Sequence, residues 1–154
     1  MDREMFMREA ICQAWEAFSK DEVPVGAVIV RGGEIIAKGR NRRIETKSAL
    51  AHAELEAIKM ACEITGDWRL EDCEIYVTLE PCSMCAGAII NARLPVVCFG
   101  ASDTVLGAAG GACDLFEEKF SHKPEVYSGI LGEECAEILS LFFKRLRERK
   151  TAKK

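Results

Sequence analysis

The sequence lacks any apolar run long enough to span a membrane, and its charged first ten residues, MDREMFMREA, lack the hydrophobic core of a signal peptide. It also lacks internal repeats and low-complexity tracts. We therefore expect no membrane association, a cytoplasmic location, and a reducing compartment in which the cysteines stay unpaired. With 154 residues, of which 49% are hydrophobic, the chain can form one well-buried core. The expectation is a single domain over residues 1–154.

A second C-x-x-C pair is also missing, although the chain contains eight cysteines. This absence argues against a zinc ribbon or finger, because nothing completes the second half of such a site. The cysteines outside the one C-x-x-C are expected to be small core or surface thiols. They are Cys12, Cys62, Cys73, Cys98, Cys113 and Cys135.

An overall excess of positive charge, which favours nucleic-acid binding, is missing too, since the formal net charge is −4. The charges are unevenly distributed, however. Residues 144–154 (KRLRERKTAKK) hold seven Lys or Arg against one Glu. A second basic group comprises Arg40, Arg42, Arg43 and Lys47. Each group alone is typical of a solvated helix end or a polar loop, and contact with RNA phosphates is the alternative interpretation.

The chain does contain two short motifs that favour metal chemistry. AHAEL at 51–55 includes H-x-E, and TLEPCSMCAGAII at 78–90 includes P-C-x-x-C. One nitrogen and two sulfur ligands, from His52, Cys82 and Cys85, suit a borderline-soft metal such as zinc. Three protein ligands leave one position open for water, which is typical of a catalytic site. We therefore expect one zinc ion per chain.

The spacing of these residues indicates how they meet. Cys82 and Cys85, three apart at the start of a helix, project from one side of one turn, where the helix dipole favours their thiolate form. His52 must then come from a second helix end that faces the first. Glu54 lies two residues after His52, too close to be a comfortable fourth ligand. It is well placed to reach a water on the metal and to move its proton, so we assign Glu54 the catalytic role.

Two other interpretations of the motifs remain open. The cluster can be a closed structural zinc site, with Cys73, Cys98 or Cys113 as the fourth ligand. The chain can also be a zinc-stabilised RNA-binding module without catalysis. The closed site is disfavoured because the remaining cysteines are isolated and no second C-x-x-C exists. The binding module is disfavoured by Glu54, because structure alone does not require a carboxylate at that position.

Hydrophobic periodicity predicts alternating helices and strands. The expected order is a helix over 2–20, a strand over 24–30, a hairpin at Gly32–Gly33, a returning strand over 34–40, a loop over 41–51, a helix across 51–61, a strand over 72–79, a buried helix over 83–92, a strand over 95–100, an irregular stretch over 101–124, a short strand over 125–127 and a helix over 132–150. This alternation predicts an α/β protein with three layers, α/β/α, in which helices cover both faces of a five-stranded sheet. The metal motifs fall where strands end and helices begin.

With these motifs in place, the chain resembles the cytidine deaminase-like superfamily and, within it, the bacterial tRNA-specific adenosine deaminases. The resemblance covers about residues 3 to 149. It is carried by EVPVGAVIV at 22–30, Asn41, TLEPCSMCAGAIINAR at 78–93, FGASD at 99–103, GAAG at 107–110 and GILGEECAEILSLFFKR at 129–145. The chain departs from the family pattern at residues 48–50, which are Ser-Ala-Leu instead of the common Asp-Pro-Thr, and at Val105, where lysine is common.

The resemblance implies a mixed sheet and hydrolytic deamination of adenosine to inosine at the wobble position of a tRNA anticodon loop. It implies that His52, Cys82 and Cys85 bind zinc and that Glu54 shuttles the proton. Further residues are implied to contact the substrate. These are Asn41 and the Ala53 amide on the flipped base, Val25 and Leu79 lining its pocket, and Asp103 near the ribose. Apart from the resemblance, the concentration of positive charge in residues 144–154 predicts that Lys144 and Arg145 lie along RNA phosphates.

The resemblance also implies a homodimer, for which the apolar segment 86–90 offers a surface. A free nucleobase or mononucleotide deaminase of the same fold, of the guanine or cytosine type, is the alternative function, because the zinc motif is shared across the superfamily. Such an enzyme has no need of the basic C-terminal segment.

Overall fold

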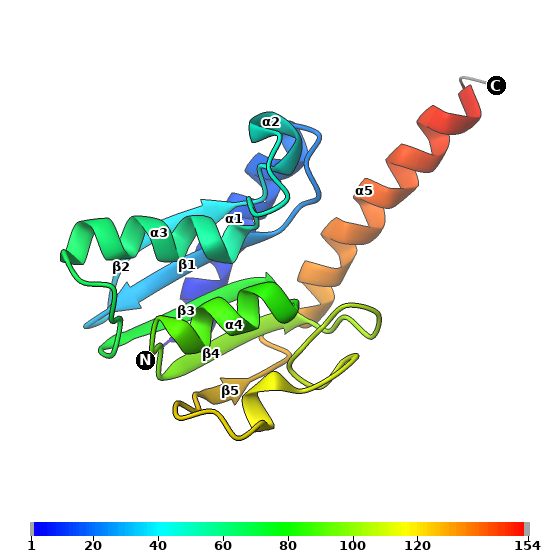
Figure 1. Ribbon diagram of the computed structural model, residues 1–154. Helices are drawn as coiled ribbons and strands as arrows, with labels where there is room; N and C mark the ends of the chain where they lie inside the picture. The colour runs from blue at the N-terminus through cyan, green and yellow to red at the C-terminus, as the bar shows by residue number, and fades with distance from the viewer. Residues whose placement is uncertain (1, 153–154) are drawn as a thin grey trace.

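The computed structural model describes residues 2–152, which form a mixed five-stranded sheet with strand order β2-β1-β3-β4-β5 (Figure 1). The strands are β1 (Gly26–Arg31), β2 (Glu34–Arg40), β3 (Cys73–Leu79), β4 (Val96–Ala101) and β5 (Glu125–Tyr127). The helices are α1 (Arg3–Ser19), α2 (Arg43–Thr46), α3 (Ala53–Thr65), α4 (Ser83–Asn91) and α5 (Gly132–Ala152), with a 3₁₀ turn at Leu115–Glu117. Strand β1 pairs antiparallel with β2 and β3, whereas β3, β4 and β5 run parallel.

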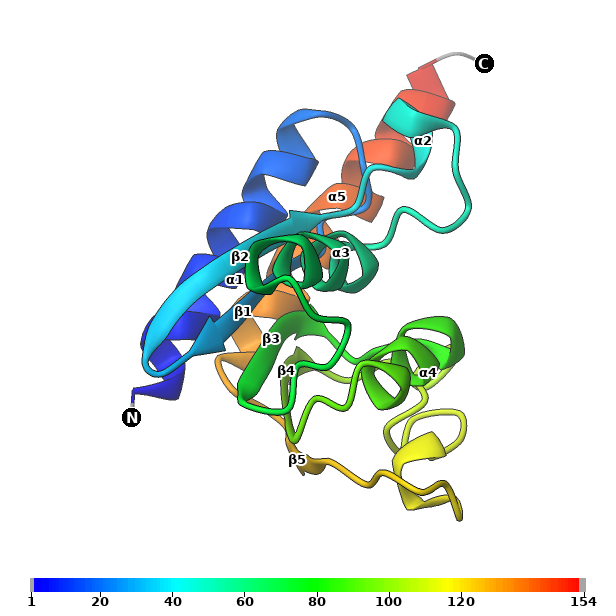
Figure 2. The same ribbon diagram turned by 60° about the vertical axis from the view of Figure 1, so that its left-hand side comes forward.

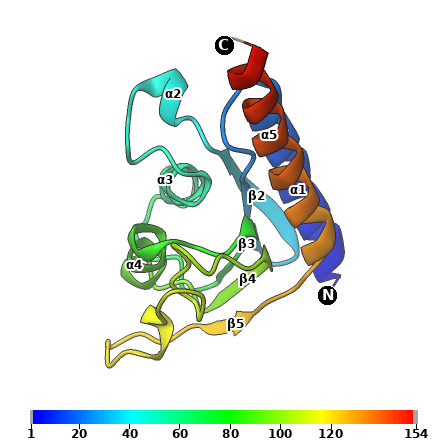
Figure 3. The same cartoon turned by 90° about the vertical axis from the view of Figure 1, so that its right-hand side faces the viewer.

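The helices cover both faces of the sheet, which confirms the predicted three-layer α/β/α arrangement. Helices α3 and α4 lie on one face, and α1 and α5 lie together on the other (Figures 2 and 3). Each face has its own hydrophobic cluster, one built around α3 and α4 and the other around α1 and α5. Because β3 is followed by α4 and then by the parallel strand β4, this part of the chain is the expected βαβ unit.

Close packing against small residues fixes the two helices that flank β1 and β2. A Cβ atom at Gly26 of β1 would collide with the α1 backbone at Ala10 and Ala14. Likewise, a Cβ atom at Gly39 of β2 would collide with the carbonyl oxygen of Ala53, the first residue of α3. Helix α3 therefore begins directly against the sheet, which determines where the residue before it, His52, is held.

Two sequence predictions are wrong in detail. The expected loop over 41–51 contains α2, because the buried carboxylate of Glu22 accepts hydrogen bonds from the N–H groups of Ile44 and Glu45, at 3.1 and 2.8 Å. Helix α4 was expected to be buried all round, yet Ser83, Gly87 and Asn91 are exposed. In the chain by itself, only the face of α4 that bears Cys85, Ala86 and Ile89 is buried.

The structure bears on the expected lack of a membrane-spanning helix and on the state of the cysteines. Among residues 2–152, no helix combines the length and apolarity needed to cross a bilayer. All eight cysteines are free, with Cys12 and Cys113 exposed and Cys73, Cys98 and Cys135 buried in the core. The prediction of small core or surface thiols is thereby confirmed for these five.

Candidate active site

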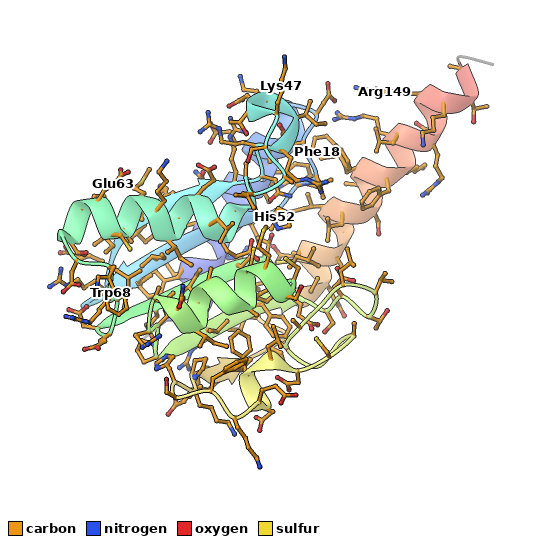
Figure 4. The ribbon with its side chains drawn as sticks, in the orientation of Figure 1. Phe18, Lys47, His52, Glu63, Trp68 and Arg149 are labelled. Carbon is orange, nitrogen blue, oxygen red and sulfur yellow. The ribbon has the colours of Figure 1, made fainter. Side chains whose placement is uncertain are left out.

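Three side chains that can bind a metal ion converge where α3 and α4 begin. His52 is the N-cap residue of α3, Cys82 is the N-cap residue of α4, and Cys85 lies in the first turn of α4. Figure 4 shows His52 at this end of α3, between the two helices. The three ligand atoms lie within 4.8 Å of one another. The inference that two helix ends share one site therefore holds in the structure.

The spacing of the ligand atoms fits a tetrahedral zinc ion. His52 Nδ1 lies 3.6 Å from Cys82 Sγ and 3.5 Å from Cys85 Sγ. Zinc–sulfur bonds of about 2.3 Å and zinc–nitrogen bonds of about 2.0–2.1 Å at tetrahedral angles place nitrogen and sulfur about 3.6 Å apart. Among the described residues, this cluster includes no fourth His, Cys, Asp or Glu ligand. The structure thus disfavours a closed structural site completed by Cys73, Cys98 or Cys113.

The two cysteines titrate in opposite directions. Hydrogen bonds from the Cys85 thiol and from His52 lower the pKa of Cys82 to about 4. The adjacent Cys82 sulfur and burial raise the pKa of Cys85. Two neighbouring thiolates repel each other unless a cation lies between them. The donor set therefore needs a metal ion to hold both sulfurs deprotonated.

Glu54 is buried beside the cluster, with 4% of its surface exposed. Burial raises the pKa of this carboxyl to about 7. Glu54 lies close enough to interact with the Cys85 thiol but is not one of the three clustered ligands. A carboxyl with a pKa near neutrality can both accept and return a proton at physiological pH.

A cavity of about 420 Å³ opens next to Glu54 and the metal ligands. The structure brings most of the predicted substrate-binding side chains together around it. Those that line the cavity are Val25, Asn41, Leu79 and Asp103, together with His52, Glu54 and Cys82. A volume of this size is in the range of small-molecule sites.

Asn41 and Ala53 are joined directly to each other. The Ala53 N–H donates a hydrogen bond of 2.9 Å to Asn41 Oδ1, and Asn41 is only 6% exposed. In this arrangement the side-chain amide of Asn41 fixes the first turn of α3, the turn that carries Glu54. Its NH₂ group remains the donor available to a ligand in the cavity.

Lys144 and Arg145 lie on α5 beyond the residues that line the cavity. Lys144 is exposed. Arg145 instead packs on the body of the protein. Its guanidinium carbon lies 4.1 Å from the Phe18 ring centroid, and its Nη2 donates to the Phe18 carbonyl oxygen and to Asp21 Oδ1, at 3.1 and 3.0 Å. The contacts of both residues with RNA remain predictions, and Arg145 has to share or leave Asp21 to make one.

Several residues that line the cavity were not predicted from the sequence. These are Val23, Glu80, Ser102, Leu106, Leu139 and Phe143, whereas Arg43, which also lines it, belongs to the second basic group. Leu139 and Phe143 belong to the apolar stripe of α5, which from sequence alone is indistinguishable from core. Glu80 carries a stronger signal, because it is a carboxylate placed between an apolar strand and the first cysteine of the metal motif.

The sequence matches the MafB19-like deaminase family over residues 1–147. The tRNA-specific adenosine deaminase of Bacillus subtilis (strain 168) is 50% identical over 150 residues, which cover 97% of this chain and 93% of that protein. The tRNA-specific adenosine deaminase of Rickettsia bellii (strain RML369-C) is 50% identical over 145 residues, covering 92% of this chain and all of the relative.

Solved structures agree with these relatives. A structure from a study of A-to-I editing by tRNA:A34 deaminases at the wobble position matches with a TM-score of 0.87 and 46% identity, over 89% of this chain and 100% of that one. A guanine deaminase from Bacillus subtilis matches less well, with a TM-score of 0.65 and 34% identity over 96% and 95% of the two chains.

The mixed sheet and the His-Cys-Cys cluster at two helix ends together define an enzyme of the deaminase class. At 44–50% identity over nearly its whole length, the chain belongs to the tRNA-specific adenosine deaminase family.

Proposed function

We propose that this protein deaminates adenosine to inosine at the wobble position of a tRNA anticodon loop, with one zinc ion per chain. The observation that carries the proposal is the meeting of the metal cluster, His52, Cys82 and Cys85, with the buried carboxyl of Glu54 at the floor of one cavity. The family relationship selects adenosine in tRNA as the substrate.

The chemistry replaces the amino group on C6 of adenine by oxygen from water and releases ammonia. His52, Cys82 and Cys85 would hold the zinc ion, and when bound it would lower the pKa of a water to about 7, which makes that water nucleophilic near neutral pH. Glu54 accepts a proton from this water and delivers it to the ring nitrogen N1. The same carboxyl then transfers the second water proton to the departing amino group. The pKa of about 7 at Glu54 suits both directions of transfer.

The target base has to leave its stack to reach the cavity. Nucleotides of an anticodon loop are already partly unstacked, which lowers the cost of flipping relative to a duplex. In our proposal the base lies between Val25 and Leu79, with the NH₂ group of Asn41 at its polar edge. The Ala53 N–H, which donates to Asn41 Oδ1, contacts the base only if it leaves that hydrogen bond. Asp103 lies near the ribose, at the mouth of the cavity.

The rest of the RNA is proposed to follow the positively charged end of α5, starting at Lys144 and Arg145. Figure 1 shows that the C-terminal half of α5 projects beyond the sheet, so its side chains are available to a long ligand. Support comes from the exposed cations Lys144, Arg147 and Lys150, for which the described residues provide no ion-pair partner. The last two residues of the basic segment, 153–154, lie outside the described part of the chain.

We further propose that residues 1–154 act as one catalytic domain, that the active form is a homodimer, and that it works in the cytoplasm. The exposed face of α4 supports the dimer, because Ser83 has a small side chain and Gly87 has none, which leaves open space for a second chain. Light scattering tests this part. A mass of twice 17.0 kDa at assay concentration supports the dimer, and 17.0 kDa contradicts it.

The experiment for the function uses purified zinc-loaded protein and a tRNA anticodon stem-loop with adenosine at the wobble position. Sequencing is expected to read G at that position after incubation, with stoichiometric release of ammonia. The matched control carries its only loop adenosine one position further along, and it is expected to remain unchanged. Conversion of free guanine or a free nucleotide, with no change in the stem-loop, contradicts the proposal and favours the free-base alternative.

A further inference from the structure

Glu80 is a second buried carboxylate at the cavity, and the reaction described above does not use it. Only 4% of its surface is exposed. It follows β3 and directly precedes Pro81 and the ligand Cys82. Among the described residues, no Arg, Lys or His forms an ion pair with Glu80. A buried carboxylate without a cation has to be stabilised by hydrogen-bond donors.

Three backbone N–H groups of one loop supply that stabilisation. Asp103 N–H donates to Glu80 Oε1 at 3.1 Å, while Ala109 N–H and Gly111 N–H donate to Oε2 at 2.9 and 2.8 Å. These donors come from a stretch of nine residues, 103–111, which we call the rim loop. One carboxylate therefore joins the start, the later part and the end of the rim loop.

The close approach of the rim loop to Glu80 also requires glycine at two positions of the loop. A Cβ atom at Gly107 would collide with the Glu80 carboxylate and the Asp103 carbonyl oxygen. A Cβ atom at Gly111 would collide with the same carbonyl oxygen and crowd the carboxylate. The loop thus wraps around Glu80 at backbone distance, which only residues without a side chain permit.

The rim loop in turn forms one wall of the cavity. Asp103 and Leu106 line it, and Asp103 Oδ1 accepts the N–H groups of Val105 and Leu106 at 3.0 and 3.1 Å. Leu106 is 67% exposed and Val105 is 76% exposed. Hydrophobic packing therefore contributes little to the position of Val105 and Leu106. Their position depends instead on the hydrogen bonds that Glu80 and Asp103 accept.

We infer that Glu80 is a positioning residue for substrate binding, which fixes the rim loop as a rigid wall for the target nucleotide without touching the nucleotide itself. The inference rests on the proposed function for its substrate. In Glu80→Gln, an amide NH₂ replaces one carboxylate oxygen, so at least one of the three N–H donors faces another donor and loses its partner. The wall then loosens, while the metal cluster and Glu54 keep their places.

The test compares zinc-loaded wild type and Glu80→Gln on the anticodon stem-loop. We expect KM to rise roughly tenfold with kcat within about threefold, because a loosened wall weakens binding of the substrate and of the transition state alike. Zinc content is expected to be unchanged. A purely structural role predicts a different split, since fewer folded molecules lower kcat per mole of protein and leave KM as it was. That second pattern overturns the inference.

Hydrogen–deuterium exchange on the zinc-loaded protein tests the same idea without substrate. The amides of Asp103, Ala109 and Gly111 are expected to exchange at least tenfold faster in Glu80→Gln. Asp67→Asn is the matched control. Asp67 Oδ1 also accepts a backbone N–H, that of Arg69 at 3.0 Å, and neither residue belongs to the rim loop. Unchanged exchange of the three rim-loop amides contradicts the role of Glu80, whether or not the stem-loop is a substrate.

Gly111→Ala provides an independent variant that leaves Glu80 intact. Its new Cβ displaces the rim loop from the carboxylate, so the same rise in KM with retained zinc is expected. If Glu80→Gln does not fold, this variant decides the question, and an unchanged KM in folded Gly111→Ala overturns the inference. Failure of wild type to deaminate the stem-loop is a separate result, which contradicts the proposed function and leaves the exchange measurement to judge Glu80.

Discussion

The metal cluster and the basic end of α5 are both conspicuous in the sequence, one by the spacing of its ligands and the other by its charge. In the cluster the conspicuous side chains converge, with His52 Nδ1 3.5 and 3.6 Å from the two sulfurs. In α5 they diverge. Arg145 and Arg149 donate hydrogen bonds to Asp21, whereas Lys144, Arg147 and Lys150 have no ion-pair partner among the described residues. The spacing of metal ligands therefore predicts where their side chains lie, because a metal ion accepts only one arrangement of them. A run of positively charged residues does not predict where each side chain lies.

The largest effect is expected from the cluster itself. Alanine at His52, Cys82 or Cys85 should abolish zinc binding and deamination, because residues 2–152 supply only three ligand atoms to this site. The exposed Cys113 provides the control, and Cys113→Ala should keep about one zinc per chain. Metal analysis that shows Cys113 to be equally required would revive the closed structural site.

Removing the metal should leave Cys82 as the most reactive thiol at low pH. With a pKa of about 4, Cys82 is a thiolate at pH 6, whereas burial raises the pKa of both Cys73 and Cys98 to about 11. Iodoacetamide and mass spectrometry at pH 6 should therefore find Cys82 labelled well before Cys73 and Cys98, and also before the exposed Cys12. Zinc should protect Cys82. Equal labelling of Cys82 and Cys12 in the metal-free protein would refute the lowered pKa.

For the basic end of α5, we expect most of the RNA contact to come from Lys144, Arg147 and Lys150, because Arg145 and Arg149 are paired with Asp21. Glutamine at Lys144, Arg147 and Lys150 together should flatten the slope of log K against log salt for the stem-loop by about 2, since each phosphate contact on single-stranded RNA contributes about 0.7. Zinc content should stay the same. Glutamine at Lys59 and Lys119 is the matched control. A slope unchanged by the triple variant would show that RNA is held elsewhere.

The smallest effect is expected where α5 is held by Asp21. Asp21 Oδ1 accepts from Arg145 at 3.0 Å and from Arg149 at 2.9 Å, and Asp21 has φ 60°, which asparagine also tolerates. Asp21→Asn therefore removes mainly the charge, and should lower the free energy of unfolding by about 1 kcal/mol, as partly exposed charge-assisted hydrogen bonds do. Urea denaturation measures it, with Glu148→Gln on the solvated side of α5 as the control. No loss in Asp21→Asn beyond that control would show that the contact contributes nothing.

Much of the fold could be predicted because it depends on local patterns. The continuously apolar β1 is buried on both faces apart from its last residue, and β5 occupies the predicted residues, Glu125–Tyr127. The metal ligands could be predicted for the same reason, since two cysteines three residues apart at the start of a helix project from the same side of the helix. Helix α4 misled the prediction because its apolar composition does not reveal which side meets the sheet.

The rest depends on contacts between distant residues. Glu22 caps α2 from 22 and 23 positions away, and Glu80 reaches donors 23 to 31 positions along the chain. A single carboxylate carries no periodicity, so the sequence does not reveal which distant N–H groups Glu22 or Glu80 binds, even where the position of Glu80 beside the metal motif draws attention to it. Arg145 is similar, because its partners Phe18 and Asp21 come from the other end of the sequence.

The central claim is that the metal cluster and Glu54 act as one catalytic unit, in which the cluster holds zinc and Glu54 moves the protons. The direct measurement is the single-turnover rate of zinc-loaded Glu54→Gln on the wobble-adenosine stem-loop, with zinc counted in the same sample. The account predicts about one zinc per chain and a rate at least ~10²-fold below wild type, the lower bound for loss of general acid–base catalysis. A zinc-loaded variant with a near-normal rate would contradict it.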